Sequence, residues 1–239
     1  MRPSRLLLTS LALACATFSL GGSTGRSAAL LPEVVHQMSD AHKASDAGTL
    51  DFAIAHADLI LLPETVSVSM KFENVPDAQH KTCMKALDAA LAAWESALGK
   101  SIHFRKEDDP SKADISIRFR SDVRMGHEAV AGFTNWKRTI KTEGAKVVET
   151  AFKADVQVRA RDLSFAPMTF EAMRQETEHE LGHILGLEDS EHQGDLMGAL
   201  DISHPVNGPR DYEVDAVRSL RDEAKQVKTD ALARQKQAG

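Results

Sequence analysis

The segment from Thr177 to Met197 reads TEHELGHILGLEDSEHQGDLM, and it constrains the fold more than any other stretch of the chain. Positions i and i+4 lie one above the other on a helix, so His179 and His183 direct their rings toward one point. Gly186 follows three residues later and can adopt a positive φ, which ends a helix. The segment therefore predicts a helix after which the chain turns back and brings a downstream side chain toward the histidines.

The histidine pair and its neighbours are typical of a metal site. Imidazole suits Zn²⁺, which takes three protein ligands and keeps an open position when it acts in catalysis. The turn points to Asp189 as the third ligand, six residues beyond His183, with His192 as the alternative, nine residues beyond. Glu180 is rotated by about 100° from His179 around the helix. It is therefore expected beside the metal, where a carboxylate can take a proton from water.

The first 29 residues have the pattern of a secretory signal peptide. Two arginines precede an apolar run at residues 6–20, and small residues follow up to Ala29, near which we expect cleavage. The run is too short and too poorly flanked for a membrane span. A lipoprotein signal ending at Cys15 is the alternative, although Ala12 stands where such signals usually carry a larger aliphatic residue. The sequence thus predicts export to the periplasm or the extracellular space.

Charge and cysteine content narrow the range of partners. The 239-residue chain has a net charge of −6, which becomes −9 without the leader because three arginines and no acidic residue leave with it. An acidic chain is a poor nucleic-acid binder, so no nucleic-acid partner is expected. Only Cys83 remains, which excludes an intrachain disulfide, and its apolar helical surroundings indicate a buried thiol. Nothing in the composition indicates an oligomeric state.

Hydrophobic patterning predicts a mixed fold of the α+β class. Residues 30–63 are helix-prone and form either a first helical layer or a pro-segment. The helix at 80–98 places Met84, Leu87, Leu91 and Trp94 on one face. The remaining expected elements are a strand from Thr65 (VSVSMKF), strands at 102–104 and 113–119, a strand pair at 129–140 and 146–159 around Gly144, a helix at 169–186 with Thr169 as N-cap, and a helix at 211–235 whose charged distal half frays.

The run HELGHILGLED at residues 179–189, followed by DLM at 195–197, resembles the metzincin pattern HExxHxxGxxH or HExxHxxGxxD with its downstream methionine turn. Upstream, the segments VSVSMKF, ALAAWE, ADISIRF and AGFT are similar, in that order, to the matrixin catalytic domain. The resemblance covers approximately residues 64–220 and predicts a matrixin-like metallopeptidase domain at 64–239.

The resemblance implies a twisted, mostly parallel sheet whose antiparallel edge strand lines the cleft, with two long helices and a C-terminal helix. It favours Asp189 over His192, because Asp189 holds the motif position of the snapalysin-like branch and Met197 lies eight residues after it. Met197 would form an apolar floor under the zinc. Gly198 departs from the usual tyrosine or proline, and a PRCGxPD-like latency motif is missing.

The resemblance also implies a substrate mode and a mechanism. A peptide or protein substrate would add to the sheet edge, and the segment expected there is Val130, Ala131, Gly132, Phe133 and Thr134, continuing to Trp136. The pocket wall would follow at residues 198–209. Zinc would polarise the scissile carbonyl and acidify a water molecule, whose proton Glu180 accepts. Structural Ca²⁺ is also implied, but the acidic run at 107–110 places too few carboxylates to name its ligands.

Three functions are compatible with these residues. The leading hypothesis is a secreted zinc endopeptidase. The alternative is a non-catalytic exported protein that keeps the metallopeptidase scaffold for binding, against which the intact Glu180 argues. The third is a narrow processing peptidase or amide hydrolase that acts on one partner.

Overall fold

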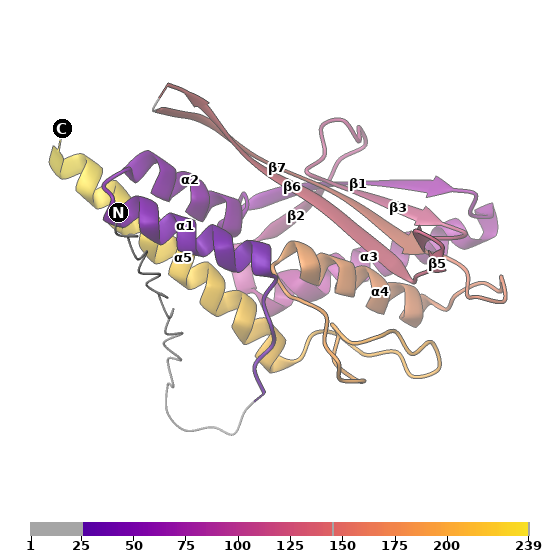
Figure 1. The fold of residues 1–239 in the computed structure, drawn as a ribbon. Helices are drawn as coiled ribbons and strands as arrows, with labels where there is room; N and C mark the ends of the chain where they lie inside the picture. Colours follow the sequence, from indigo (N-terminus) through magenta and orange to yellow (C-terminus); the bar gives the residue numbers. More distant parts are fainter. Residues whose placement is uncertain (1–25, 145, 239) are drawn as a thin grey trace, which may run out of the picture.

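A five-stranded sheet with the strand order β2-β1-β3-β7-β6 lies at the centre of the fold (Figure 1). The computed structural model describes residues 26–144 and 146–238. Neighbouring strands are parallel except β6, which pairs antiparallel with β7 and forms one edge. The strands are β1 (Thr65–Glu73), β2 (His103–Lys106), β3 (Ile115–Arg120), β6 (Gly132–Glu143) and β7 (Lys146–Arg159). The predicted mixed fold, with a mostly parallel sheet and an antiparallel edge strand, is confirmed.

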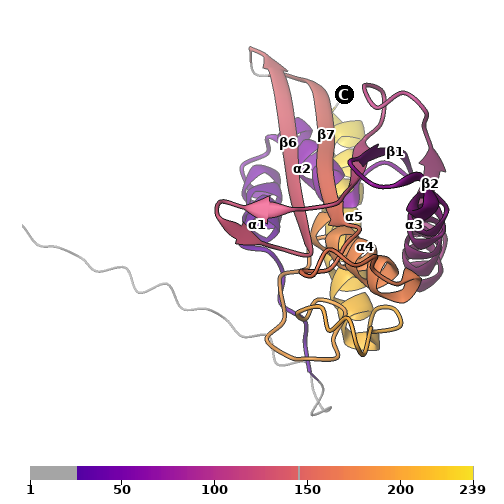
Figure 2. The same cartoon turned by 90° about the vertical axis from the view of Figure 1, so that its right-hand side faces the viewer.

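Helices cover one face of this sheet and form a separate bundle beside it (Figures 1 and 2). In the described residues these are α1 (Pro32–Asp46), α2 (Leu50–Leu61), α3 (Asp77–Ala97), α4 (Phe170–Ile184) and α5 (Asp211–Ala238). A 3₁₀ turn at Gly99–Ser101 follows α3, and a small hairpin of β4 (Arg124–Met125) and β5 (Glu128–Ala129) precedes β6. The helices α3 and α4 pack on the sheet, whereas α1 and α2 pack with α5.

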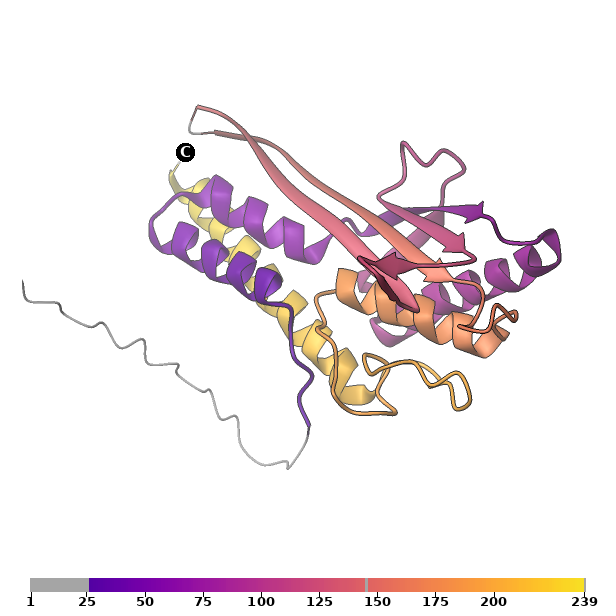
Figure 3. The same cartoon turned by 45° about the vertical axis from the view of Figure 1, so that its right-hand side comes forward.

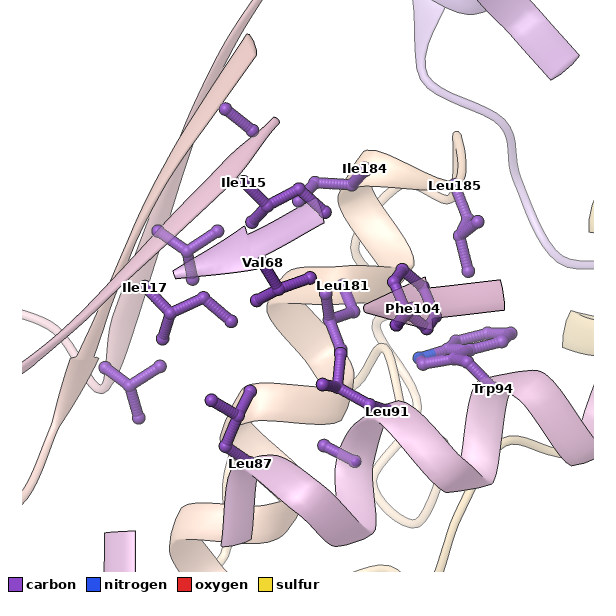
Figure 4. Close-up of a cluster of buried hydrophobic side chains, with 14 of the residues drawn as sticks. Val68, Leu87, Leu91, Trp94, Phe104, Ile115, Ile117, Leu181, Ile184 and Leu185 are labelled. Atoms are coloured by element: carbon purple, nitrogen blue, oxygen red, sulfur yellow. The ribbon is translucent and has the colours of Figure 1, made fainter. Parts of the chain in front are cut away.

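The main core lies between the sheet and the two helices α3 and α4. Alternation along β3 turns Ile115, Ile117 and Phe119 inward, and all three are fully buried. In Figure 4, Ile117 and Ile115 face Leu181 of α4 across the core. Burial of such side chains contributes about 1.5–3 kcal/mol each. This packing fixes the helix that carries the histidine pair against the sheet.

A second apolar core joins the N-terminal segment to the C-terminal helix. Gly48, with φ +76°, separates the helix-prone segment into α1 and α2. The buried side chains of this core are Val34, Met38, Ala41, Ala53, Ala57, Ile60, Leu220, Ala224, Val227 and Ala231. Residues 30–63 thus share a core with α5.

The expectation that the distal half of the last helix frays is wrong. The helix α5 continues to Ala238, because Ala231 is buried and polar side chains beyond it reach the N-terminal helices. Arg234 donates to the carbonyl of Ser45 at 2.7 Å, and Gln235 donates to Asp51 at 2.5 Å. A charged sequence does not reveal such partners.

Two further predictions are corrected. The edge strand begins at Gly132 rather than at residue 129, because the chain first turns through the β4–β5 hairpin. Val130 and Ala131 therefore precede the strand, although the carbonyl of Ala131 still accepts from the Arg159 N–H at 2.8 Å. Met84, expected on the buried face of α3, is 40% exposed, because Cys83 takes the inner position one turn before Leu87.

Cys83 is fully buried, as expected, and burial raises the pKa of its thiol to about 11. The signal-peptide interpretation of residues 1–29, including the lipidation alternative at Cys15, falls outside the described residues up to residue 25. Residues 26–29 of that segment are described and lie along the turn after α4, where the Glu188 N–H donates to the Ala29 carbonyl at 3.0 Å. Among the described helices, none combines the length and the apolar character of a membrane span.

Candidate metal centre and active site

The helix α4 begins and ends at local signals in its sequence. The Thr169 hydroxyl accepts a hydrogen bond from the Ala172 N–H at 3.1 Å, which caps the first turn as predicted. The helix ends at Ile184, and Gly186 follows with φ +105°, a conformation that glycine adopts without strain. The chain reverses there, which confirms the predicted turn.

The reversal brings Asp189 to the histidine pair. The Asp189 Oδ1 atom lies 3.2 Å from His179 Nε2 and 3.4 Å from His183 Nε2. Ligands at zinc distances of about 2.0–2.1 Å and tetrahedral angles would lie about 3.3 Å from one another. Two imidazoles and a carboxylate at this spacing therefore fit Zn²⁺.

Backbone carbonyls orient both imidazole rings. Nδ1 of His179 lies 3.0 Å from the Leu196 carbonyl, and Nδ1 of His183 lies 2.9 Å from the Leu187 carbonyl. Since a carbonyl only accepts, each Nδ1 carries the hydrogen and each Nε2 keeps its lone pair for a metal. Both carbonyls come from the chain after α4, so the turn and the segment before Met197 set the ring orientations.

Asp189, and not His192, joins the histidines. Among the described residues, His179, His183 and Asp189 form the only group of three potential ligands, with ligand atoms within 4.8 Å of one another. In the metal-free protein, contact with the two imidazoles, when they are protonated, holds the pKa of the Asp189 carboxyl group far below its usual range. His192 is exposed on the following loop, where its backbone carbonyl accepts from the Asp195 N–H at 3.3 Å. The structural Ca²⁺ stays a prediction without assigned ligands.

Glu180 lies beneath the edge strand, beside the metal cluster, the name used for the side chains of His179, His183 and Asp189. Its side chain is 3% exposed, and the Thr134 hydroxyl donates to its Oε2 atom at 2.5 Å. Burial, and secondarily the neighbouring Glu176, raises the pKa of Glu180 to about 7. A carboxyl group that titrates near neutrality is suited to accept and return a proton.

Met197 packs under α4 on the turn that follows the cluster. It is fully buried, and a Cβ atom on Gly182 would lie 2.4 Å from its sulfur, so any larger residue at 182 would displace the methionine side chain. The buried Glu213 carboxylate holds this turn, because it accepts from the Met197 N–H at 2.9 Å and from the Leu196 N–H at 3.3 Å. Tyr212 bonds to Asp195, away from the metal cluster.

A cleft of about 810 Å³ opens over the cluster. Residues 130–136 line it, as expected of the edge segment, and so do Met197 and, from the predicted pocket wall, residues 198–200. In Figure 3 the edge strand β6 passes across α4. Leu31 and Glu33 also line the cleft.

Sequence reasoning missed four residues of the site, Leu31, Glu33, Glu176 and Glu213. The spacing of Glu176, four residues before Glu180, is a signal that was present in the sequence. The other three reach the site only through tertiary packing.

Comparison with known families agrees with this geometry. Residues 63–215, more than half of the chain, match the family model for matrixins. The chain belongs to the matrixin family. The matched region spans the sheet, α3, α4 and the metal cluster, and the family is one of zinc metalloproteases. The predicted matrixin resemblance is thereby confirmed. A search of curated proteins finds no match to this chain.

Proposed function

We propose that this matrixin is an exported zinc endopeptidase in which His179, His183 and Asp189 hold the metal and Glu180 is the general base. One observation carries the proposal. The two Nε2 atoms and the Asp189 carboxylate converge at the spacing of tetrahedral zinc ligands, directly beside a buried carboxyl group in a cleft.

The chemistry follows from the positions of the side chains. Bound zinc would supply a Lewis acid that polarises the scissile carbonyl and acidifies a water molecule. Glu180 accepts the proton of the attacking water and later donates it to the leaving amine nitrogen, so the base is regenerated.

The open edge of β6 supports a peptide as the substrate. Its outer N–H and C=O groups face away from β7, so an extended peptide can pair with them as an added strand. Gly132 and Thr134 contact Glu180, so a peptide paired with the start of this edge would lie beside the proposed base.

Export follows from the leader-like sequence before Ala29. We propose that the exported chain keeps residues 30–63, because their removal would expose the apolar face of α5 at Leu220 and Val227. Mass spectrometry of the exported protein would show the retained segment as an N-terminus close to Leu30. An N-terminus near Thr65 would contradict this.

The test combines metal analysis with hydrolysis of casein and of a peptide library, with and without a chelator. We expect one zinc per chain and cleavage that the chelator abolishes. Glu180→Gln should retain zinc and lose about 100- to 10,000-fold in kcat, whereas Glu171→Gln, at an exposed position of the same helix, should keep the wild-type rate.

The alternatives have distinct outcomes. Zinc and peptide binding without cleavage would indicate a binding protein that keeps the scaffold, and cleavage of a single library sequence would indicate a narrow processing enzyme. Absence of zinc at neutral pH would count against every hydrolase hypothesis.

A further inference from the structure

Glu176 is a buried acid that the mechanism above does not use. It lies one turn before Glu180 on α4, is 5% exposed, and lines the same cleft. Burial raises the pKa of its carboxyl group to about 7. A buried carboxyl group is costly unless a neighbour uses its hydrogen-bonding capacity.

The carboxyl groups of Glu176 and Glu180 meet under the backbone of the edge strand. A Cβ atom on Gly132 would lie 2.4 Å from Oε1 of Glu176 and 2.3 Å from Oε1 of Glu180. The two Oε1 atoms therefore lie within 4.7 Å of each other. A protonated carboxyl group can donate a hydrogen bond to a neighbouring carboxylate oxygen.

The two oxygens of the Glu180 carboxyl group therefore face different neighbours, one from the edge strand and one from α4 itself. The Thr134 hydroxyl of β6 donates to Oε2 at 2.5 Å, and Glu176 of α4 lies at Oε1. These two contacts restrict rotation of a side chain that is otherwise free about three bonds. The absence of a side chain at Gly132 leaves room for the pair.

We propose that Glu176 is a positioning residue that holds the Glu180 carboxyl group at the floor of the cleft. The proposal rests on the role of Glu180 as general base. Glu176 acts through Glu180, because its carboxyl group lies beside that of Glu180 under Gly132 of the edge strand. Among the described residues, Glu176 does not belong to the group of potential metal ligands.

Kinetics of the full-length zinc protein test the proposal. Glu176→Leu removes the carboxyl group beside Glu180 with little change in volume. We expect kcat to fall about 10- to 100-fold with KM unchanged, because a base displaced by about 1 Å loses that much rate. Glu176→Gln, whose amide can donate to Oε1, should restore kcat to within about threefold of wild type. The matched control Glu171→Leu makes the same change at an exposed position of α4 and should keep the wild-type kcat.

A double-mutant cycle separates positioning from independent catalysis. In the Glu180→Gln background, Glu176→Leu should have no further effect on kcat. A further loss there, or a wild-type kcat in the single Glu176→Leu variant, would overturn the proposal.

Crystal structures supply a readout that does not need activity. In Glu176→Leu we expect the Glu180 carboxyl group to leave its wild-type position or to occupy several, and in Glu176→Gln to keep it. An unchanged Glu180 in Glu176→Leu refutes the positioning role. If Glu176→Leu does not fold, Gly132→Ala displaces the pair from the opposite side and should shift Glu180 in the same way. If the wild type hydrolyses nothing, the proposed function fails, while these structures still decide the role of Glu176.

Discussion

Replacement of Gly186 by alanine tests how the turn after α4 builds the metal site. Gly186 has φ +105°, outside the region that L-residues with a side chain adopt. An added Cβ would also lie 3.1 Å from Leu220 Cδ2 and 3.3 Å from Val34 Cγ1, so the turn is wedged between α5 and α1. The substitution therefore adds backbone strain and crowding at one position.

The magnitude follows from these two contributions. A non-glycine residue in such a conformation costs about 1–3 kcal/mol, and crowding of a packed contact adds about 1 kcal/mol or more. Together they predict a loss of roughly 3 kcal/mol, which corresponds to a decrease of roughly 6–12 °C in Tm for a chain of this size. Zinc affinity should fall as well, because the Leu187 carbonyl and Asp189 follow directly on the turn.

Gly48→Ala is the matched control. Gly48 also has a positive φ, +76°, but a Cβ there would meet no atom within 4 Å. We expect it to lose only about 1 kcal/mol and to keep its zinc affinity. Both variants would be compared by thermal unfolding of the metal-free protein and by zinc titration. Equal decreases in Tm, or wild-type zinc affinity in Gly186→Ala, would refute the reasoning.

Two further predictions concern zinc and pH. Zinc at 1,000 times its Kd should stabilise the folded chain by about 4 kcal/mol. In thermal unfolding, Asp189→Ala should lose much of this stabilisation, whereas His192→Ala should lose none. The reverse ranking would identify His192 as the ligand. Burial raises the pKa of Glu178 to about 7 from 4.5, so its contribution to stability is present below pH 4.5 and is lost as the pH rises through 7. Glu178→Gln cannot ionise, so in metal-free protein it should be more stable than wild type at pH 8, by at most about 3 kcal/mol, and no more stable at pH 4.5. A gain of equal size at both pH values in urea unfolding would contradict this cause.

The periodic parts of the chain were predictable. Alternation identified β1 and β3, and the turn at Gly144 was expected between the strands now seen as β6 and β7. The helix α4 was expected from its N-cap at Thr169 to its stop at Gly186, because both signals act within one turn of the backbone. Local chemistry decides such features, so a single sequence carries them.

Partners from distant segments were not predictable. The α5 helix was expected to fray, since nothing in its charged sequence shows that Arg234 meets Ser45. The start of β6 was misplaced because the β4–β5 hairpin intervenes. Glu213 was missed because its carboxylate is bound by backbone N–H groups 16 and 17 residues away.

The sequence by itself determined the pair His179 and His183, the carboxylate of Glu180 one position on, and the glycine that reverses the chain, because helix geometry and backbone conformation are local. The sequence favoured Asp189 over His192, and the tertiary structure brings the Asp189 carboxylate within 3.2 and 3.4 Å of the two histidines, whereas His192 is exposed on the following loop. The tertiary structure also decided the surroundings of Glu180, the proposed general base. Only the approach of β6 to α4 places Gly132 over Glu176 and Glu180, and burial at that contact raises the pKa of both carboxyl groups to about 7.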